Sequence, residues 1–80
     1  MLVELINKEI KILKSFNLFN VGIEGRIEKE TLNMLYIRTS ENKLKRIEKR
    51  IVLFKILEQN LIIDGSRIKN IYERVSLYNL

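Results

Sequence analysis

The sequence contains no cysteine and no histidine, so neither a disulfide nor a usual zinc site can stabilise its fold. A chain of 80 residues makes at most one domain. At this length, folding buries only about 60% of the surface that the unfolded chain exposes. The chain must therefore pack very well or gain core by oligomerising. We expect a single domain over residues 1–80 that is completed by homodimerisation.

Apolar residues recur at helical spacing along most of the chain. Between residues 2 and 16 they fall on one broad face of a helical wheel, with Glu4 and three lysines opposite. Similar amphipathic patterns recur in residues 26–38, in residues 41–60 and from Arg67 onward. We therefore predict an all-α fold, a small bundle of three or four helices.

Two segments allow a different interpretation. Residues 32–39, LNMLYIRT, are rich in β-branched and aromatic residues and would also suit a short strand. In residues 61–68, LIIDGSRI, the pair Asp64-Gly65 is a turn signal that could join a hairpin. Ser66 in the same segment would instead cap a helix. Whether these two segments are helix, strand or turn stays open.

The residues that most enzymes use are missing. Without histidine and cysteine, the familiar triads and thiol nucleophiles are excluded. The only aspartate, Asp64, stands beside a turn glycine, and Glu28 and Glu30 would point about 200° apart on a helix. The spacing Gly22-x-x-Gly25 lacks the Lys-Ser or Lys-Thr of a phosphate-binding loop. We expect a protein that is not an enzyme and that binds no metal, cofactor or small-molecule substrate.

The sequence shows no targeting or membrane signal. No apolar run of about 18 residues is present, so no transmembrane helix is predicted. The start, MLVELINKEI, carries glutamate and lacks a cleavage site of small residues. The polar face of the expected first helix mixes Glu4 with lysines, which argues against binding at a membrane surface. We expect a cytoplasmic protein.

Positive charge is concentrated in one segment. Residues 41–60 contain six cations and three glutamates, which account for +3 of the net charge of +5. On a helix, most of these cations would share one arc and could follow the phosphates of duplex nucleic acid. This pattern predicts a small basic nucleic-acid-binding regulatory protein. Its expected phosphate contacts are Lys43, Lys45, Arg46, Lys49 and Arg50.

The opposite side of the same segment supports a second hypothesis. Four apolar residues step by three and four along it, as in the seam of a coiled coil. They are Leu44, Ile47, Ile51 and Phe54. The chain would then be a non-enzymatic protein-interaction module that oligomerises or docks a partner helix. The cations opposite would be only the solvated side of an amphipathic helix.

One stretch also resembles a known fold. The run TSENKLKRIEKR followed by LEQNLIIDG is similar to a winged-helix pattern. In that pattern, a capped basic recognition helix precedes a leucine-glutamate ending and a wing strand. The sequence departs from it at Asn60, where a glycine normally follows the leucine-glutamate ending. We keep a winged-helix-like α+β fold as the alternative.

Overall fold

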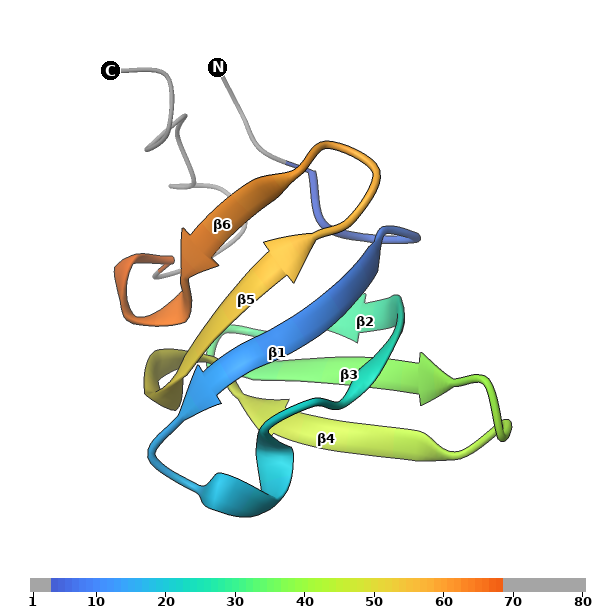
Figure 1. The fold of residues 1–80 in the computed structure, drawn as a ribbon, viewed down its shortest axis with the longest axis horizontal. Helices are drawn as coiled ribbons and strands as arrows, with labels where there is room; N and C mark the ends of the chain where they lie inside the picture. Colours follow the sequence, from blue (N-terminus) through green and yellow to red (C-terminus); the bar gives the residue numbers. More distant parts are fainter. Residues whose placement is uncertain (1–3, 69–80) are drawn as a thin grey trace.

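The computed structural model describes residues 4–68, and every regular element in this range is a β-strand or a short 3-10 turn (Figure 1). The all-α prediction is therefore wrong for this part of the chain, and so is the winged-helix alternative, which needs helices here. No helix in the described range is long and apolar enough to cross a membrane. The elements are β1 (Glu9–Ser15), η1 (Leu18–Asn20), β2 (Glu24–Glu30), β3 (Met34–Thr39), β4 (Leu44–Glu48), η2 (Lys49–Ile51), β5 (Val52–Ile56), β6 (Leu61–Asp64) and η3 (Gly65–Arg67).

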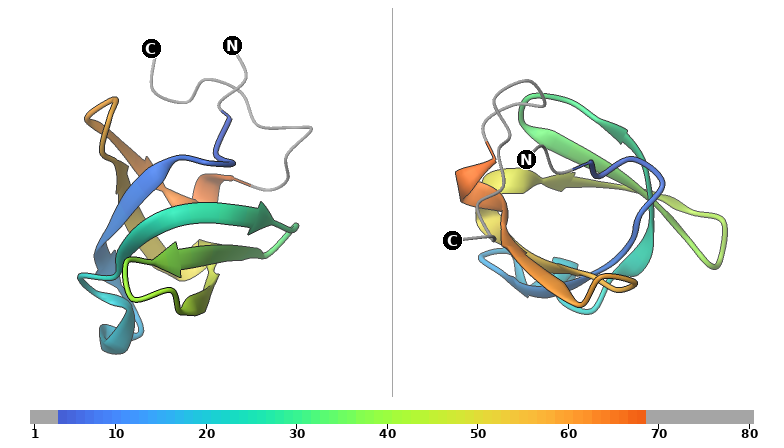
Figure 2. Two further views of the ribbon diagram at one scale, coloured as in Figure 1. Left: turned by 90° about the vertical axis from the view of Figure 1, so that its right-hand side faces the viewer. Right: turned by 90° about the horizontal axis from the view of Figure 1, so that it is seen from above.

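The strands form one antiparallel sheet in the order β4-β3-β2-β1-β5-β6. Figure 2 shows that this sheet curls around a central core into a barrel-like shape. Two bulges interrupt the ladders, between Ile12 and Lys14 in β1 and between Ile27 and Lys29 in β2. Because a bulge increases the local twist and bends its strand, both irregularities help the sheet to curl. The short turns η2 and η3 also lie against each other.

Within the described residues, strands take the place of the predicted helices, and β1 shows the alternation of apolar residues most clearly. Ile10 and Ile12 in β1 are buried while Glu9 and Lys11 between and beside them are exposed, which is the period of a strand with one face on the core. The predicted helix over residues 41–60 is divided into β4, η2 and β5. Isoleucine and leucine are so frequent in this sequence that many apolar residues have other apolar residues two, three and four positions away. The same residues therefore fit the pattern of a helix as well as that of a strand.

Of the two open segments, residues 32–39 contain strand β3, as the alternative for that segment proposed. Residues 61–68 form β6 and then η3, where Asp64 caps the turn by accepting a hydrogen bond from the amide of Ser66 at 3.0 Å. The predicted helix from Arg67 onward lies almost wholly outside the described residues.

Asparagine makes the tight connections. Asn42 follows β3 with φ of 63°, and Asn60 follows β5 with φ of 53°. Asparagine tolerates this left-handed region better than most residues. The two hairpins β3–β4 and β5–β6 therefore depend on side chains that the helical interpretation did not use.

The core lies inside the curled sheet and is built mainly from isoleucine. Burying one such side chain contributes about 1.5–3 kcal/mol, so this core supplies the main stabilisation of the domain. β-branched side chains also suit the pleated inner surface of a sheet. The buried apolar residues are Leu5, Ile10, Ile12, Ile27, Leu35, Ile37, Ile47, Val52, Phe54, Ile56, Ile63 and Ile68.

Candidate nucleic-acid interface

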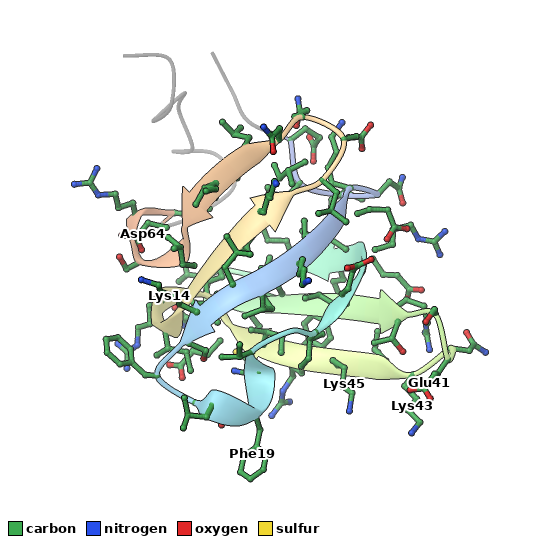
Figure 3. The ribbon with its side chains drawn as sticks, viewed as in Figure 1. Lys14, Phe19, Glu41, Lys43, Lys45 and Asp64 are labelled. Atoms are coloured by element: carbon green, nitrogen blue, oxygen red, sulfur yellow. The ribbon has the colours of Figure 1, made fainter. Side chains whose placement is uncertain are left out.

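Three of the predicted phosphate contacts are exposed on one hairpin. Lys43 lies in the turn between β3 and β4, and Lys45 and Arg46 lie in β4. Lys45 pairs with Ile37 and Arg46 pairs with Tyr36, so these two cations point to opposite faces of the strand instead of sharing one helical arc. Lys43 and Lys45 extend away from the barrel, with Glu41 beside Lys43 (Figure 3). Within the described range, none of the three cations forms an ion pair.

Lys49 lies elsewhere. Its side chain is almost fully buried, and its Nζ is 2.6 Å from Oε2 of Glu30. Burial lowers the pKa of Lys49 to about 8, because the interior solvates an ammonium poorly. From this position Lys49 cannot reach a phosphate, so we leave it out of the candidate surface.

Arg50 is exposed, but it lies at the other end of β4 from the hairpin turn. Its Nε donates a hydrogen bond to Oε1 of Glu48 at 3.1 Å, and 77% of its side chain remains accessible. The sequence grouped Arg50 with Lys43, whereas the strand separates them by its full length.

The predicted interface stripe does not form. Ile47 and Phe54 are in the core, and Ile51 packs partly against it. Leu44 alone is largely exposed, at 48%, on the outer face of β4. A continuous apolar docking surface made of these residues is therefore absent from the described part of the chain.

The outer face of β2 and β3 has mixed charge. Arg38 donates two hydrogen bonds to the carboxylate of Glu28, at 2.8 and 3.1 Å, and Arg26 lies 3.6 Å from the same carboxylate. The hydrogen bonds from Arg38 hold the pKa of Glu28 below its ordinary value. Lys29 sits over the ring of Tyr36 at 5.3 Å. These cations are already paired, so they are weaker candidates for phosphate contacts than those of the hairpin.

Another set of cations, which the sequence analysis overlooked, lies on the outer face of β1 and β5. Lys11 pairs directly with Lys55 across the ladder, and Lys14 pairs with Leu53. Like charges directly opposite each other destabilise a sheet, and a bound anion would relieve that cost. Glu24 on β2 is the only acidic residue paired with any of these lysines in the described ladders. Alternation in the run EIKILK was the signal that could have revealed this face.

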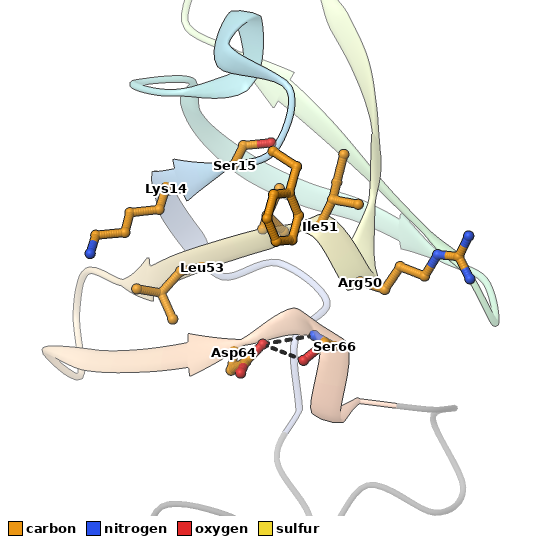
Figure 4. Close-up of a pocket in the computed structure, with 9 residues that line it drawn as sticks. Lys14, Ser15, Arg50, Ile51, Leu53, Asp64 and Ser66 are labelled. Atoms are coloured by element: carbon orange, nitrogen blue, oxygen red, sulfur yellow. Dashed lines mark hydrogen bonds between the residues drawn. The ribbon is translucent and has the colours of Figure 1, made fainter.

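An open pocket of about 480 Å³ lies where the end of β1 meets η2, the start of β5 and the β6–η3 connection (Figure 4). Phe16, Ile51 and Leu53 contribute apolar surface, and Lys14 and Arg50 stand on opposite sides. No group of three acidic side chains in residues 4–68 could hold a metal ion.

The loop after β1 exposes large apolar side chains. Phe16 is 90% exposed and Phe19 is 93% exposed. The loop is nevertheless held by local hydrogen bonds, since Asn17 caps η1 and the hydroxyl of Ser15 accepts from the amide of Asn17 at 3.0 Å. Of these two exposed rings, Phe16 lines the pocket and Phe19 does not, so Phe16 is the candidate for contact with a ligand.

A sequence profile of the family described as ribonuclease P/MRP, subunit p29, matches residues 1–75. The chain belongs to the p29 family. It is 39% identical over 75 residues to ribonuclease P protein component 1 of Nitrosopumilus maritimus, and the match covers 90% of this chain and 84% of that protein. It is 46% identical over 46 residues to ribonuclease P protein component 1 of Methanosarcina mazei, which covers 58% of this chain and 42% of that protein.

A solved structure has the same fold. The structure of Mth11, described as a homologue of human RNase P protein Rpp29, superposes with a TM-score of 0.64 at 30% identity. The superposition covers 91% of this chain and 99% of Mth11. The expected helical regulatory protein is therefore replaced by a sheet protein of the p29 family. The hairpin cations and the pocket all lie within the family match.

Proposed function

We propose that this chain is an RNA-binding protein component of a ribonuclease P ribonucleoprotein. Its membership of the p29 family supports an RNA partner, and the exposed cations supply the charge that such a partner requires. The observation that carries the proposal is the β3–β4 hairpin, where Lys43, Lys45 and Arg46 are exposed and form no ion pair within the described residues. This proposal replaces the duplex partner expected from the sequence with RNA.

The role that we propose for the chain itself is binding, not catalysis. The sequence lacks the histidine and cysteine on which most protein nucleases and nucleophilic enzymes depend. Its place in the particle would be to contact RNA and neighbouring subunits. A homodimer and a cytoplasmic location stay predictions.

Salt dependence of RNA binding tests this proposal. A Lys43→Gln/Lys45→Gln/Arg46→Gln variant removes three cations from the hairpin. The slope of log K against log salt on single-stranded RNA should become shallower by about 2, because each lost phosphate contact contributes about 0.7. Binding of the variant at low salt should also be weaker than that of the wild type.

A variant with the same loss of charge serves as the control. In Lys8→Gln/Arg26→Gln/Lys29→Gln, each lost cation already lies near Glu58, Glu28 or the Tyr36 ring. This control should change the salt slope much less than the hairpin variant. Equal slopes for the two variants would show that the hairpin is not the contact surface, and no RNA binding at low salt would refute the proposal.

A further inference from the structure

We propose that the pocket between β1, η2 and the β6–η3 connection holds one unstacked base of the bound RNA. This inference rests on the proposed function and names a specific contact within it. Phe16 would stack on the base, and Lys14 and Arg50 would bind the phosphates on either side.

The size and lining of the pocket suit a base. Small-molecule pockets have volumes of about 300–1,000 Å³ and mostly apolar walls with a few polar groups. The pocket of about 480 Å³ has apolar surface from Phe16, Ile51 and Leu53, together with the polar side chains of Asp64 and Ser66. Its open mouth would admit a flat ring while the sugar and phosphates stay outside.

Phe16 is held in place and yet left uncovered. Its backbone amide donates a hydrogen bond to the carbonyl of Ile51 at 3.0 Å, which ties the loop to η2 beside the pocket. The residue is nevertheless 90% exposed. A bound base would cover this exposed apolar ring, and aromatic stacking of this kind accepts any of the four bases.

The charges around the pocket also favour a nucleotide as its ligand. Lys14 and Arg50 extend on opposite sides of it, with Ile51 and Leu53 between them (Figure 4). Lys14 forms no ion pair within the described range. Arg50 donates its Nε to Oε1 of Glu48 at 3.1 Å, but 77% of its side chain is accessible, which leaves its terminal nitrogens open to a phosphate. Two cations on opposite sides of a partly apolar pocket match a nucleotide whose two phosphates leave in opposite directions.

Asp64 favours entry of the base into the pocket over entry of a phosphate. Its Oδ1 accepts hydrogen bonds from the hydroxyl of Ser66 at 2.6 Å and from the amide of Ser66 at 3.0 Å (Figure 4). These bonds lower the pKa of Asp64, so its carboxylate is charged at neutral pH. This negative charge repels a phosphate inside the pocket but does not repel a neutral base. The base would therefore point inward and the phosphates outward.

Two exposed phenylalanines in one loop provide a matched test. Phe16 lines the pocket, whereas Phe19 is equally exposed but does not line it. The probes are a 12-nucleotide single-stranded RNA and the same strand in an RNA duplex, both at low salt. Phe16→Ala should weaken binding to the single strand about 5- to 100-fold and leave duplex binding unchanged. Phe19→Ala should bind both probes like the wild type, and Phe16→Tyr should keep most of the affinity.

A crosslinking experiment locates the contact directly. Single-stranded RNA carrying 5-iodouridine should crosslink to the segment that contains Phe16, and excess inorganic phosphate at constant ionic strength should not prevent it. Equal single-strand affinity of the wild type and Phe16→Ala would overturn the pocket and leave the proposed function intact. An equal loss in Phe16→Ala and Phe19→Ala would also overturn it. A wild type that binds neither probe would overturn both the pocket and RNA binding.

Discussion

The ammonium of Lys49 and the carboxylate of Glu30 lie 2.6 Å apart, and both side chains are almost entirely buried. The pair joins η2 to the end of β2, two segments that are far apart in the sequence. The backbone reinforces the same junction, since the amide of Lys49 donates to the carbonyl of Asn33 at 2.9 Å. This ion pair thus connects the turn after β4 to the hairpin between β2 and β3.

Breaking this ion pair from one side should be costly. In a Lys49→Met variant the buried carboxyl group of Glu30 loses the ammonium that lies 2.6 Å from it, and we expect a loss of about 3–5 kcal/mol in the free energy of unfolding. Urea denaturation followed by circular dichroism would measure this loss. A domain of this size has little stability to spare, so the variant would be partly unfolded without denaturant.

Replacing both partners provides the control. A Glu30→Leu/Lys49→Met variant removes both charges of this pair, and its stability should return to within about 1–2 kcal/mol of the wild type. A single variant as stable as the wild type would mean that the Glu30 carboxyl group does not depend on Lys49. A double variant no better than the single one would point to lost packing instead of lost charge.

Gly65 should not tolerate a side chain. A Cβ at this position would collide with the carbonyl group of Lys49 and would also lie 3.0 Å from the carbonyl oxygen of Val52. Gly65→Ala must therefore push η3 away from η2, and we expect a loss of about 1–3 kcal/mol in the free energy of unfolding. Denaturation curves would measure the loss, and amide chemical shifts around Lys49 should move.

Gly22→Ala is the comparison for Gly65→Ala. Gly22 has φ of 88° but no atom within 4 Å of an added Cβ, so its substitution strains only the local backbone. The amide shifts near Lys49 should stay unchanged in this variant. Unchanged shifts in Gly65→Ala as well would contradict the crowding at η2.

A carboxylate introduced in the core should unfold the chain, whereas a carboxylate introduced at an exposed position of the same strand should not. Ile47 is 2% exposed and Leu44 in the same strand is 48% exposed. Ile47→Glu buries an unpaired carboxylate, at a cost of about 4 kcal/mol or more. Leu44→Glu should stay folded with a wild-type circular dichroism spectrum. A folded, monomeric Ile47→Glu would instead support the interface stripe expected from the sequence.

Acid should weaken the contact between β2 and β3. Because Arg38 lowers the pKa of Glu28 in the folded protein, the unfolded chain binds the proton more tightly. The stability from this group is therefore fully present above about pH 4.5 and is lost as the pH falls through the lowered value. The midpoint of urea denaturation, measured from pH 6 to pH 2, should fall less steeply in Glu28→Gln than in the wild type. Parallel curves for the two proteins would contradict this role of Glu28.

Local sequence reasoning predicted helices and allowed strands only as alternatives in two segments. The β-branched and aromatic residues of 32–39 allowed a strand as the alternative to a helix, and Met34–Thr39 is a strand. Residues 41–60 suited a helix because Leu44, Ile47, Ile51 and Phe54 step by three and four. Strands need partners that are distant in the sequence, so the pairing of β1 with β5 could not be read from either segment alone.

For the candidate site, too, the sequence determined one part and the tertiary structure the other. Composition determined that the chain is basic, has one small domain's worth of residues and lacks the usual catalytic and zinc-binding side chains. The charge pattern of residues 41–60 placed five cations in a candidate nucleic-acid surface, and three of them, Lys43, Lys45 and Arg46, are exposed together on the β3–β4 hairpin. Only the tertiary structure decided that Lys49 faces Glu30 inside the protein and that Lys14 and Arg50 flank one pocket. The physical reason is that charge belongs to the residue, whereas burial and proximity are set by strand register and by the curl of the sheet.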